Sequence, residues 1–102
     1  MQLAEHQAVR AAEIGDKIAK DRWPLFYSYA PGHLTTGDAR LALNFFAVAG
    51  ATAGLAGETE DACPLPRDAA TDYGHALRAA WFAAFAAARK AARRTPRKRP
   101  LS

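Results

Sequence analysis

The hydrophobic positions of this chain recur with the period of an α-helix in three separate segments. In residues 2–22, the positions Leu3, Ala11, Ile14 and Ile18 fall near one helix face, with charged residues opposite. No segment shows the strict alternation of apolar and polar residues that indicates a half-buried β-strand. The pattern therefore predicts a small all-α protein built from three helices.

Local signals predict where these helices begin and end. Trp23-Pro24 is expected to stop the first helix, because the residue before a proline is pushed out of helical geometry. Residues 24–36 then form an aromatic connector with a Pro-Gly turn. Thr35 and Asp38 have the spacing of a capping box, so the second helix starts near Thr35 or Thr36 and runs to about residue 57.

The third helix is predicted from about Asp68 to about Arg94, after the linker "ETEDACPLP". Thr95-Pro96 ends it, and a disordered basic C-terminal tail follows. We expect one helical domain over residues 1–94, made of an N-terminal helix and connector (1–39) and a helical hairpin (40–92), followed by the tail (95–102). The apolar stripe of the third helix consists of Tyr73, Leu77, Trp81, Phe85 and Ala88.

Small residues recur every four positions in the second helix: Gly50 and Gly54, then Ala53 and Gly57. Residues four apart share one helix face, so they leave a smooth strip that another helix can approach closely. We expect a Gly-strip hairpin in which this strip accepts the aromatic side chains of the third helix. Much of the 50% hydrophobic content is alanine, so the bulk of the core is expected from the large residues Leu3, Ile14, Ile18, Trp23, Leu25, Phe26, Tyr27, Leu41, Phe45, Phe46, Val48, Leu55, Leu77, Trp81, Phe82 and Phe85.

A membrane-spanning helix is the alternative interpretation of residues 41–57, which carry no charge. Seventeen residues are the lower limit for a span, and Asn44 and Thr52 interrupt the apolar run. The composition therefore favours packing against protein, and no membrane partner is expected.

Charge is distributed unevenly along the chain, although the net charge is only +4. Residues 1–88 hold seven Lys or Arg against ten Asp or Glu, a balance of −3. Residues 89–102 hold no acidic residue and a balance of +7. A basic segment of this kind indicates a polyanionic partner, nucleic acid first and an anionic membrane second. The candidate nucleic-acid-binding residues are Arg89, Lys90, Arg93, Arg94, Arg97, Lys98 and Arg99.

The stretch "GATAGLAGETEDACP" resembles the ribosome modulation factor family, and "LRAAWFAAFAAAR" resembles the tryptophan-bearing second helix of that family. The resemblance covers residues 40–92. It implies a small helical protein that binds ribosomal RNA of the small subunit near the messenger exit, so that ribosomes pair into inactive dimers during starvation. The linker Glu58–Asp61 is acidic where the family is basic. The residues that carry the resemblance are Gly50, Ala53, Gly54, Ala56, Gly57, Cys63, Pro64 and Trp81.

Residues that carry catalysis or bind metals are sparse. Cys63 is the single cysteine, and His75 is its nearest histidine, which falls short of the three or four ligands of a zinc site. We therefore expect a structural thiol, no metal, no cofactor and no catalytic residue. A lone cysteine and an N-terminus without an apolar run predict a protein of the reducing cytoplasm.

The sequence thus predicts a non-catalytic protein that binds ribosomal RNA and modulates translation. Two alternatives stay open. One is a small inhibitor or interaction protein that uses the same scaffold to bind a protein partner. The other is a DNA-binding protein with a basic tail. The oligomeric state is not predicted.

Overall fold

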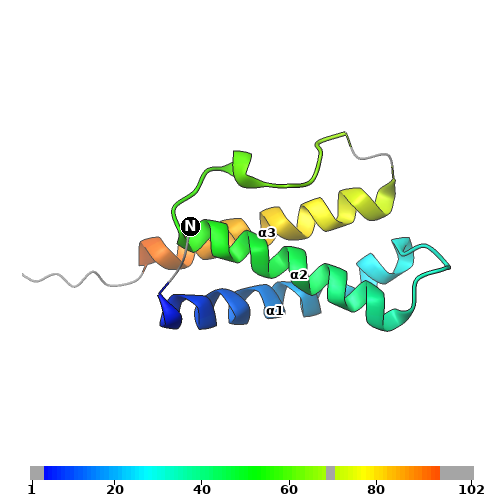
Figure 1. Ribbon diagram of the computed structural model, residues 1–102, viewed down its shortest axis with the longest axis horizontal. Helices are drawn as coiled ribbons and strands as arrows, with labels where there is room; N and C mark the ends of the chain where they lie inside the picture. The colour runs from blue at the N-terminus through cyan, green and yellow to red at the C-terminus, as the bar shows by residue number, and fades with distance from the viewer. Residues whose placement is uncertain (1–3, 69–70, 95–102) are drawn as a thin grey trace, which may run out of the picture.

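The computed structural model describes residues 4–68 and 71–94, and three α-helices make up most of them (Figure 1). Helix α1 spans Glu5–Tyr29, α2 spans Thr36–Leu55 and α3 spans Asp72–Arg94, with a short 3-10 turn, η1, at Glu60–Ala62. No strand occurs among the described residues. The predicted three-helix all-α class is therefore confirmed, and the predicted tail, with Arg97, Lys98 and Arg99, lies outside the described residues.

The directions of the helices differ from the prediction in one respect. Helix α1 runs antiparallel to α2, but α2 and α3 run parallel, and the segment between them crosses back along the length of the bundle (Figure 1). The contacts agree, because Gly50 lies against Trp81 and Gly54 lies against Phe85, four residues further along both helices. The predicted hairpin of helices two and three is thus wrong, although their predicted close packing is confirmed.

Capping side chains decide where α2 and α3 begin. The Thr35 hydroxyl accepts a hydrogen bond of 3.0 Å from the backbone N–H of Asp38, as the capping signal predicted. The Thr71 hydroxyl accepts an equivalent bond of 3.0 Å from the N–H of Gly74. Helix α3 therefore begins at Asp72, four residues later than the predicted start at Asp68.

Gly57 ends α2 and is not part of the small-residue strip. Its φ of +78° is the left-handed conformation that glycine adopts most readily. The N–H of Gly57 donates to the carbonyl of Gly54, and the N–H of Glu58 donates to that of Ala53. This pair of hydrogen bonds is a Schellman motif, which satisfies the last carbonyls of a helix.

Helix α1 passes through Pro24, where the sequence predicted its end. Proline removes one helical hydrogen bond, so other contacts must hold the last turn in place. Phe26 supplies them: it is 2% exposed, and its ring centroid lies 5.1 Å from that of Tyr73 on α3. Burial raises the pKa of the Tyr73 hydroxyl, and the carboxylate of Asp38 on α2 raises it further. All three helices therefore meet at this end of the bundle.

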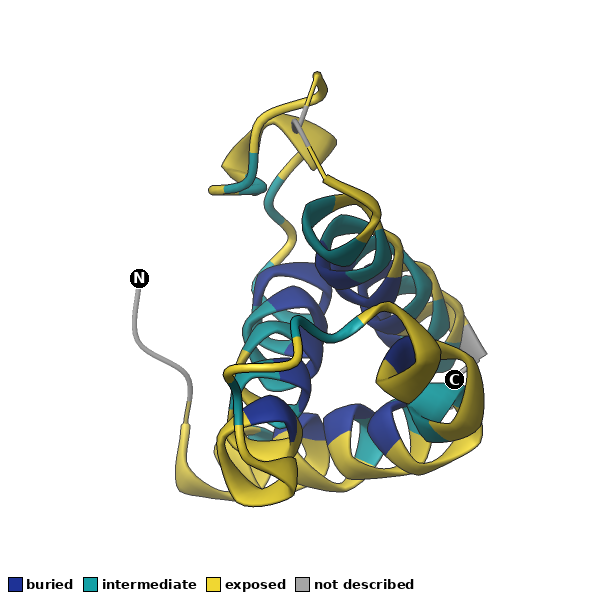
Figure 2. Ribbon diagram, turned by 90° about the vertical axis from the view of Figure 1, so that its right-hand side faces the viewer, coloured by how far each residue is buried: buried dark blue, intermediate teal, exposed yellow. Residues whose placement is uncertain are grey.

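Most buried positions are alanine or glycine, but several of the large residues that the sequence suggested for the core are there as well. Phe26, Leu77, Trp81 and Phe85 are buried, and Ile14, Ile18, Trp23, Phe46, Leu55 and Phe82 pack against the buried residues. Leu3 lies outside the described residues. The buried positions of the three helices face the centre of the bundle, and the outer surfaces are exposed (Figure 2). Among the expected core residues, Leu25, Tyr27, Leu41 and Phe45 are instead exposed. The buried small residues are Ala11, Gly15, Ala19, Ala39, Ala47, Gly50, Ala51, Ala53, Gly54, Ala80, Ala84 and Ala88.

Glycines bring the helix backbones into direct contact. A Cβ at Gly50 would collide with the carbonyl oxygen of Trp81, and one at Gly54 would lie 2.6 Å from that of Phe85. At Gly50 and Gly54 the strip thus accepts the backbone of α3, whereas the predicted contact with aromatic side chains occurs at Ala53, which packs against Trp81 and Phe85. Gly15, which the sequence analysis did not single out, allows the same approach between α1 and α2, at Val48.

We predict that Gly50→Ala lowers the free energy of unfolding by about 2–4 kcal/mol, because α3 must move away to admit the methyl group. Gly37→Ala, in the same helix, is the matched control, since its Cβ would meet only the Thr35 hydroxyl at 3.8 Å. This control should be neutral or stabilising by about 0.5 kcal/mol. Urea unfolding followed by circular dichroism measures both changes, and equal effects would contradict the backbone contact.

We also predict that Pro24→Ala stabilises the protein by about 1–3 kcal/mol, because it restores a helical hydrogen bond at an exposed position. Thermal unfolding measures the change. A loss of stability would show that proline is required for the geometry of the last turns of α1.

Candidate nucleic-acid interface

The candidate interface is the C-terminal end of α3, where Arg89, Lys90, Arg93 and Arg94 follow a run of alanines. This end lies beside the end of α2 and the start of α1, because α2 and α3 are parallel (Figure 1). Cations in the last turn of a helix are stabilised by the partial negative charge of its C-terminus. The helix therefore holds these residues together as one positively charged end.

Arg89 is half-buried and contacts the turn that ends α2. Its Nη1 donates a hydrogen bond of 3.3 Å to the carbonyl oxygen of Glu58, and its guanidinium lies 5.4 Å from the centroid of the Phe85 ring. Glu58 belongs to the turn that ends α2. Arg89 thus joins α3 to the end of α2, a structural role that the sequence did not indicate.

Lys90 and Arg93 are exposed, and within residues 4–68 and 71–93 neither forms an ion pair. The buried face of α3 holds Leu77, Trp81 and Ala88, and helical periodicity sets Lys90 and Arg93 on the outer side. These two side chains are therefore available to a phosphate group.

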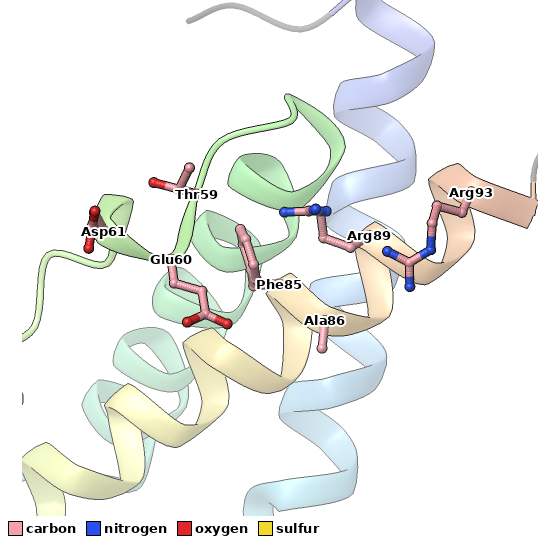
Figure 3. Close-up of a pocket in the computed structure, with 7 residues that line it drawn as sticks. All are labelled: Thr59, Glu60, Asp61, Phe85, Ala86, Arg89 and Arg93. Carbon is pink, nitrogen blue, oxygen red and sulfur yellow. The ribbon is translucent and has the colours of Figure 1, made fainter.

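A hollow of about 560 Å³ lies between the end of α3 and the start of the crossover segment (Figure 3). Arg89 and Arg93 lie on one side of it, and Glu60 and Asp61 of η1 lie on the other. Its lining combines two cations with two carboxylates, so it does not present the uniform positive charge that a phosphate needs. The outer surface of the helix end suits a polyanion better than this hollow does.

The residues that carry the family resemblance come together at the seam between α2 and α3. Trp81, Phe85 and Ala53 form a buried cluster against which Cys63 packs, and the Trp81 and Phe85 rings stack with centroids 5.1 Å apart. Gly50 and Gly54 lie along the same seam. These residues build the scaffold, whereas Pro64 and Gly57 are exposed in the segment that follows α2.

Cys63 is half-buried, and its thiol donates a long hydrogen bond of 3.8 Å to the carbonyl oxygen of Leu65. Across the described part of the chain, no three His, Cys, Asp or Glu side chains lie close enough to hold a metal ion. None of the helices described is long and apolar enough to cross a membrane.

Aromatic rings at the end of α1 form a second group. The guanidinium of Arg40 lies 4.6 Å from the centroid of the Trp23 ring, and Tyr27 is the most exposed ring of this segment at 54%. The sequence did not place Arg40 here, because the contact joins two helices. An aromatic residue followed by a cation seventeen positions later carries no local signal.

Fold and interface together define a small all-α protein: a three-helix bundle with two parallel helices, a crossover segment and a basic end. Comparison of the chain with protein-family models, with curated proteins and with solved structures found no match.

We predict that Arg89→Ala lowers the free energy of unfolding by about 1–2 kcal/mol, because it removes a charged hydrogen bond to Glu58 and the contact of the guanidinium with the Phe85 ring. Lys90→Ala is the control and should change stability by less than about 0.5 kcal/mol. Urea unfolding of both variants measures the difference. Equal stabilities would contradict the structural role of Arg89.

Proposed function

We propose that this protein is a non-catalytic RNA-binding protein whose target is the small ribosomal subunit. The observation that supports RNA binding is the basic end: Lys90 and Arg93 are exposed there, and residues 89–102 contain seven Lys or Arg and no acidic residue. The rest of the chain has a balance of −3, so the attraction of a polyanion is confined to one end.

Electrostatic contacts of this kind make the affinity for RNA depend on salt concentration. Lysine and arginine side chains displace the counterions condensed on a nucleic acid, so affinity falls steeply as salt rises. Arginine outnumbers lysine five to two in residues 89–102. Its planar guanidinium binds phosphate through two parallel hydrogen bonds and stacks on unpaired bases, which favours folded RNA.

The choice of the ribosome rests on the resemblance to the ribosome modulation factor family. Gly50, Cys63 and Trp81, which carry that resemblance, lie along one packed seam in this structure, and this supports the use of one scaffold. On such a scaffold the protein acts by occlusion: it occupies ribosomal RNA and blocks the site to messenger, without any chemical step.

We predict that the protein co-sediments with the small ribosomal subunit in a sucrose gradient at low salt and dissociates as salt rises. The double variant Lys90→Ala/Arg93→Ala should weaken binding to ribosomal RNA by about tenfold and reduce the slope of log affinity against log salt by about 1.5. Truncation after Arg94 should weaken binding further, because it removes three more cations.

The matched control is Lys17→Ala/Arg67→Ala, which removes two exposed cations away from the basic end. This control should bind RNA as the unmodified protein does. Protein that stays at the top of the gradient at every salt concentration would overturn the ribosomal target. Tighter binding to duplex DNA than to ribosomal RNA of matched charge would favour a DNA-binding protein instead.

A further inference from the structure

The outer surface of α2 is apolar and uncovered by the rest of the bundle. Leu41 is 71% exposed and Phe45 is 65% exposed, and the half-buried Val48 and Thr52 continue this helix face at its border with α1, where Val48 contacts Gly15. No charged residue occurs from position 41 to position 57. A helix that is apolar on all sides is typical of one that is buried on all sides, and this bundle buries one side of α2.

The adjoining surface of α1 carries exposed residues at helical spacing. Val9 is 55% exposed and Tyr27 is 54% exposed, and between them lies the ion pair of Asp16 with Lys20, at 3.2 Å. Positions 9, 16, 20 and 27 share one face of a helix. We call this face of α1, together with Leu41, Phe45, Val48 and Thr52 of α2, the α1–α2 face.

Contacts across the groove between α1 and α2 fix the register of the exposed residues of α1 relative to those of α2. Gly15 lies against Val48, and Trp23 lies against Arg40. Because the helices are antiparallel, a residue further along α1 lies opposite a residue earlier in α2. In this register Ile18 of α1 and Phe45 of α2 lie at the same height along the bundle. Asp16 and Lys20 line this groove, so the charged part of the α1 row borders α2 directly.

We propose that the α1–α2 face binds a second copy of this chain, related by a two-fold axis that passes at the level of Phe45 and Ile18. In that register α2 packs antiparallel to α2 of the second copy. Phe45 meets Phe45 at the axis.

The same axis makes the α1 row complementary to itself. Val9 lies level with Tyr27 of the second copy, so two exposed apolar side chains cover each other. Asp16 lies level with Lys20 of the second copy, and the reverse pair completes a ring of four alternating charges. A two-fold interface requires a surface that is complementary to itself in this way.

The size of the face indicates a reversible dimer. Helix α2 has 20 residues and is about 30 Å long, and two neighbouring helices are about 20 Å wide, so the dimer buries roughly 1,200 Å² in total. This is the lower limit for a stable interface, so the dimer should dissociate on dilution. Because the axis reverses the helices, it also sets the two basic ends at opposite ends of the assembly.

Sedimentation velocity on the full chain over a range of concentrations tests the proposal. We expect a monomer–dimer equilibrium whose dissociation constant rises at least about thirtyfold in Phe45→Glu, because two carboxylates then face each other at the axis. Leu25→Glu is the matched control, since Leu25 is 58% exposed but lies beside α3, away from the α1–α2 face. This control should dimerise as the unmodified protein does.

Charge reversal tests the register without changing the apolar residues. Asp16→Lys should weaken the dimer by about tenfold, and Asp16→Lys/Lys20→Asp should restore it to within about threefold. Phe45→Cys in a Cys63→Ser background should form a disulfide-linked dimer under mild oxidation, whereas Leu25→Cys in that background should not. Circular dichroism checks that each variant is folded.

A protein that stays monomeric at all concentrations would overturn the proposal. A dimer that resists Phe45→Glu, or one that the double charge reversal fails to restore, would also overturn it. Equal cross-linking at positions 25 and 45 would show random collision instead of a defined interface.

Discussion

The direct contact between the backbones of α2 and α3 is the constraint on which the rest of this structure depends. At Gly50 and Gly54, no side chain separates the two helices, and the carbonyl oxygens of Trp81 and Phe85 occupy the space that a Cβ would need. Helices this close leave room in the core for little more than methyl groups. Alanine therefore occupies many buried positions beside these contacts, together with the large buried side chains of Phe26, Leu43 and Trp81. The same close approach occurs between α1 and α2 at Gly15.

Two large apolar side chains of α2 lie outside the core. The core buries Phe26, Leu43 and Trp81, whereas Leu41 and Phe45 remain on the outer surface of α2. An apolar surface of this kind is unfavourable in water unless something covers it. The α1–α2 face and the basic residues of α3 lie on different surfaces. In the two proposals, the α1–α2 face binds a second copy, and the basic end of α3 remains free to contact RNA.

The basic residues at the end of α3 differ in their surroundings. Arg89 is half-buried and joins α3 to the turn after α2, whereas Lys90 and Arg93 are exposed. A count of cations along the sequence cannot separate these roles, because the distinction depends on whether a carbonyl such as that of Glu58 lies within reach. Helix periodicity places Arg89 nearer the buried face, but its partner lies 31 residues away along the chain.

By itself, the sequence determined the features that depend on neighbouring residues. The 3.6-residue periodicity predicted three helices, Thr35 predicted the start of α2, and the small residues at positions 50 and 54 predicted a close helix contact. The tertiary structure decided that Pro24 stays within α1, because the buried Phe26 holds the last turn. It also decided that α2 and α3 run parallel. A helix face has the same pattern in either direction, so the long crossover and the backbone contacts at Gly50 and Gly54 set the direction.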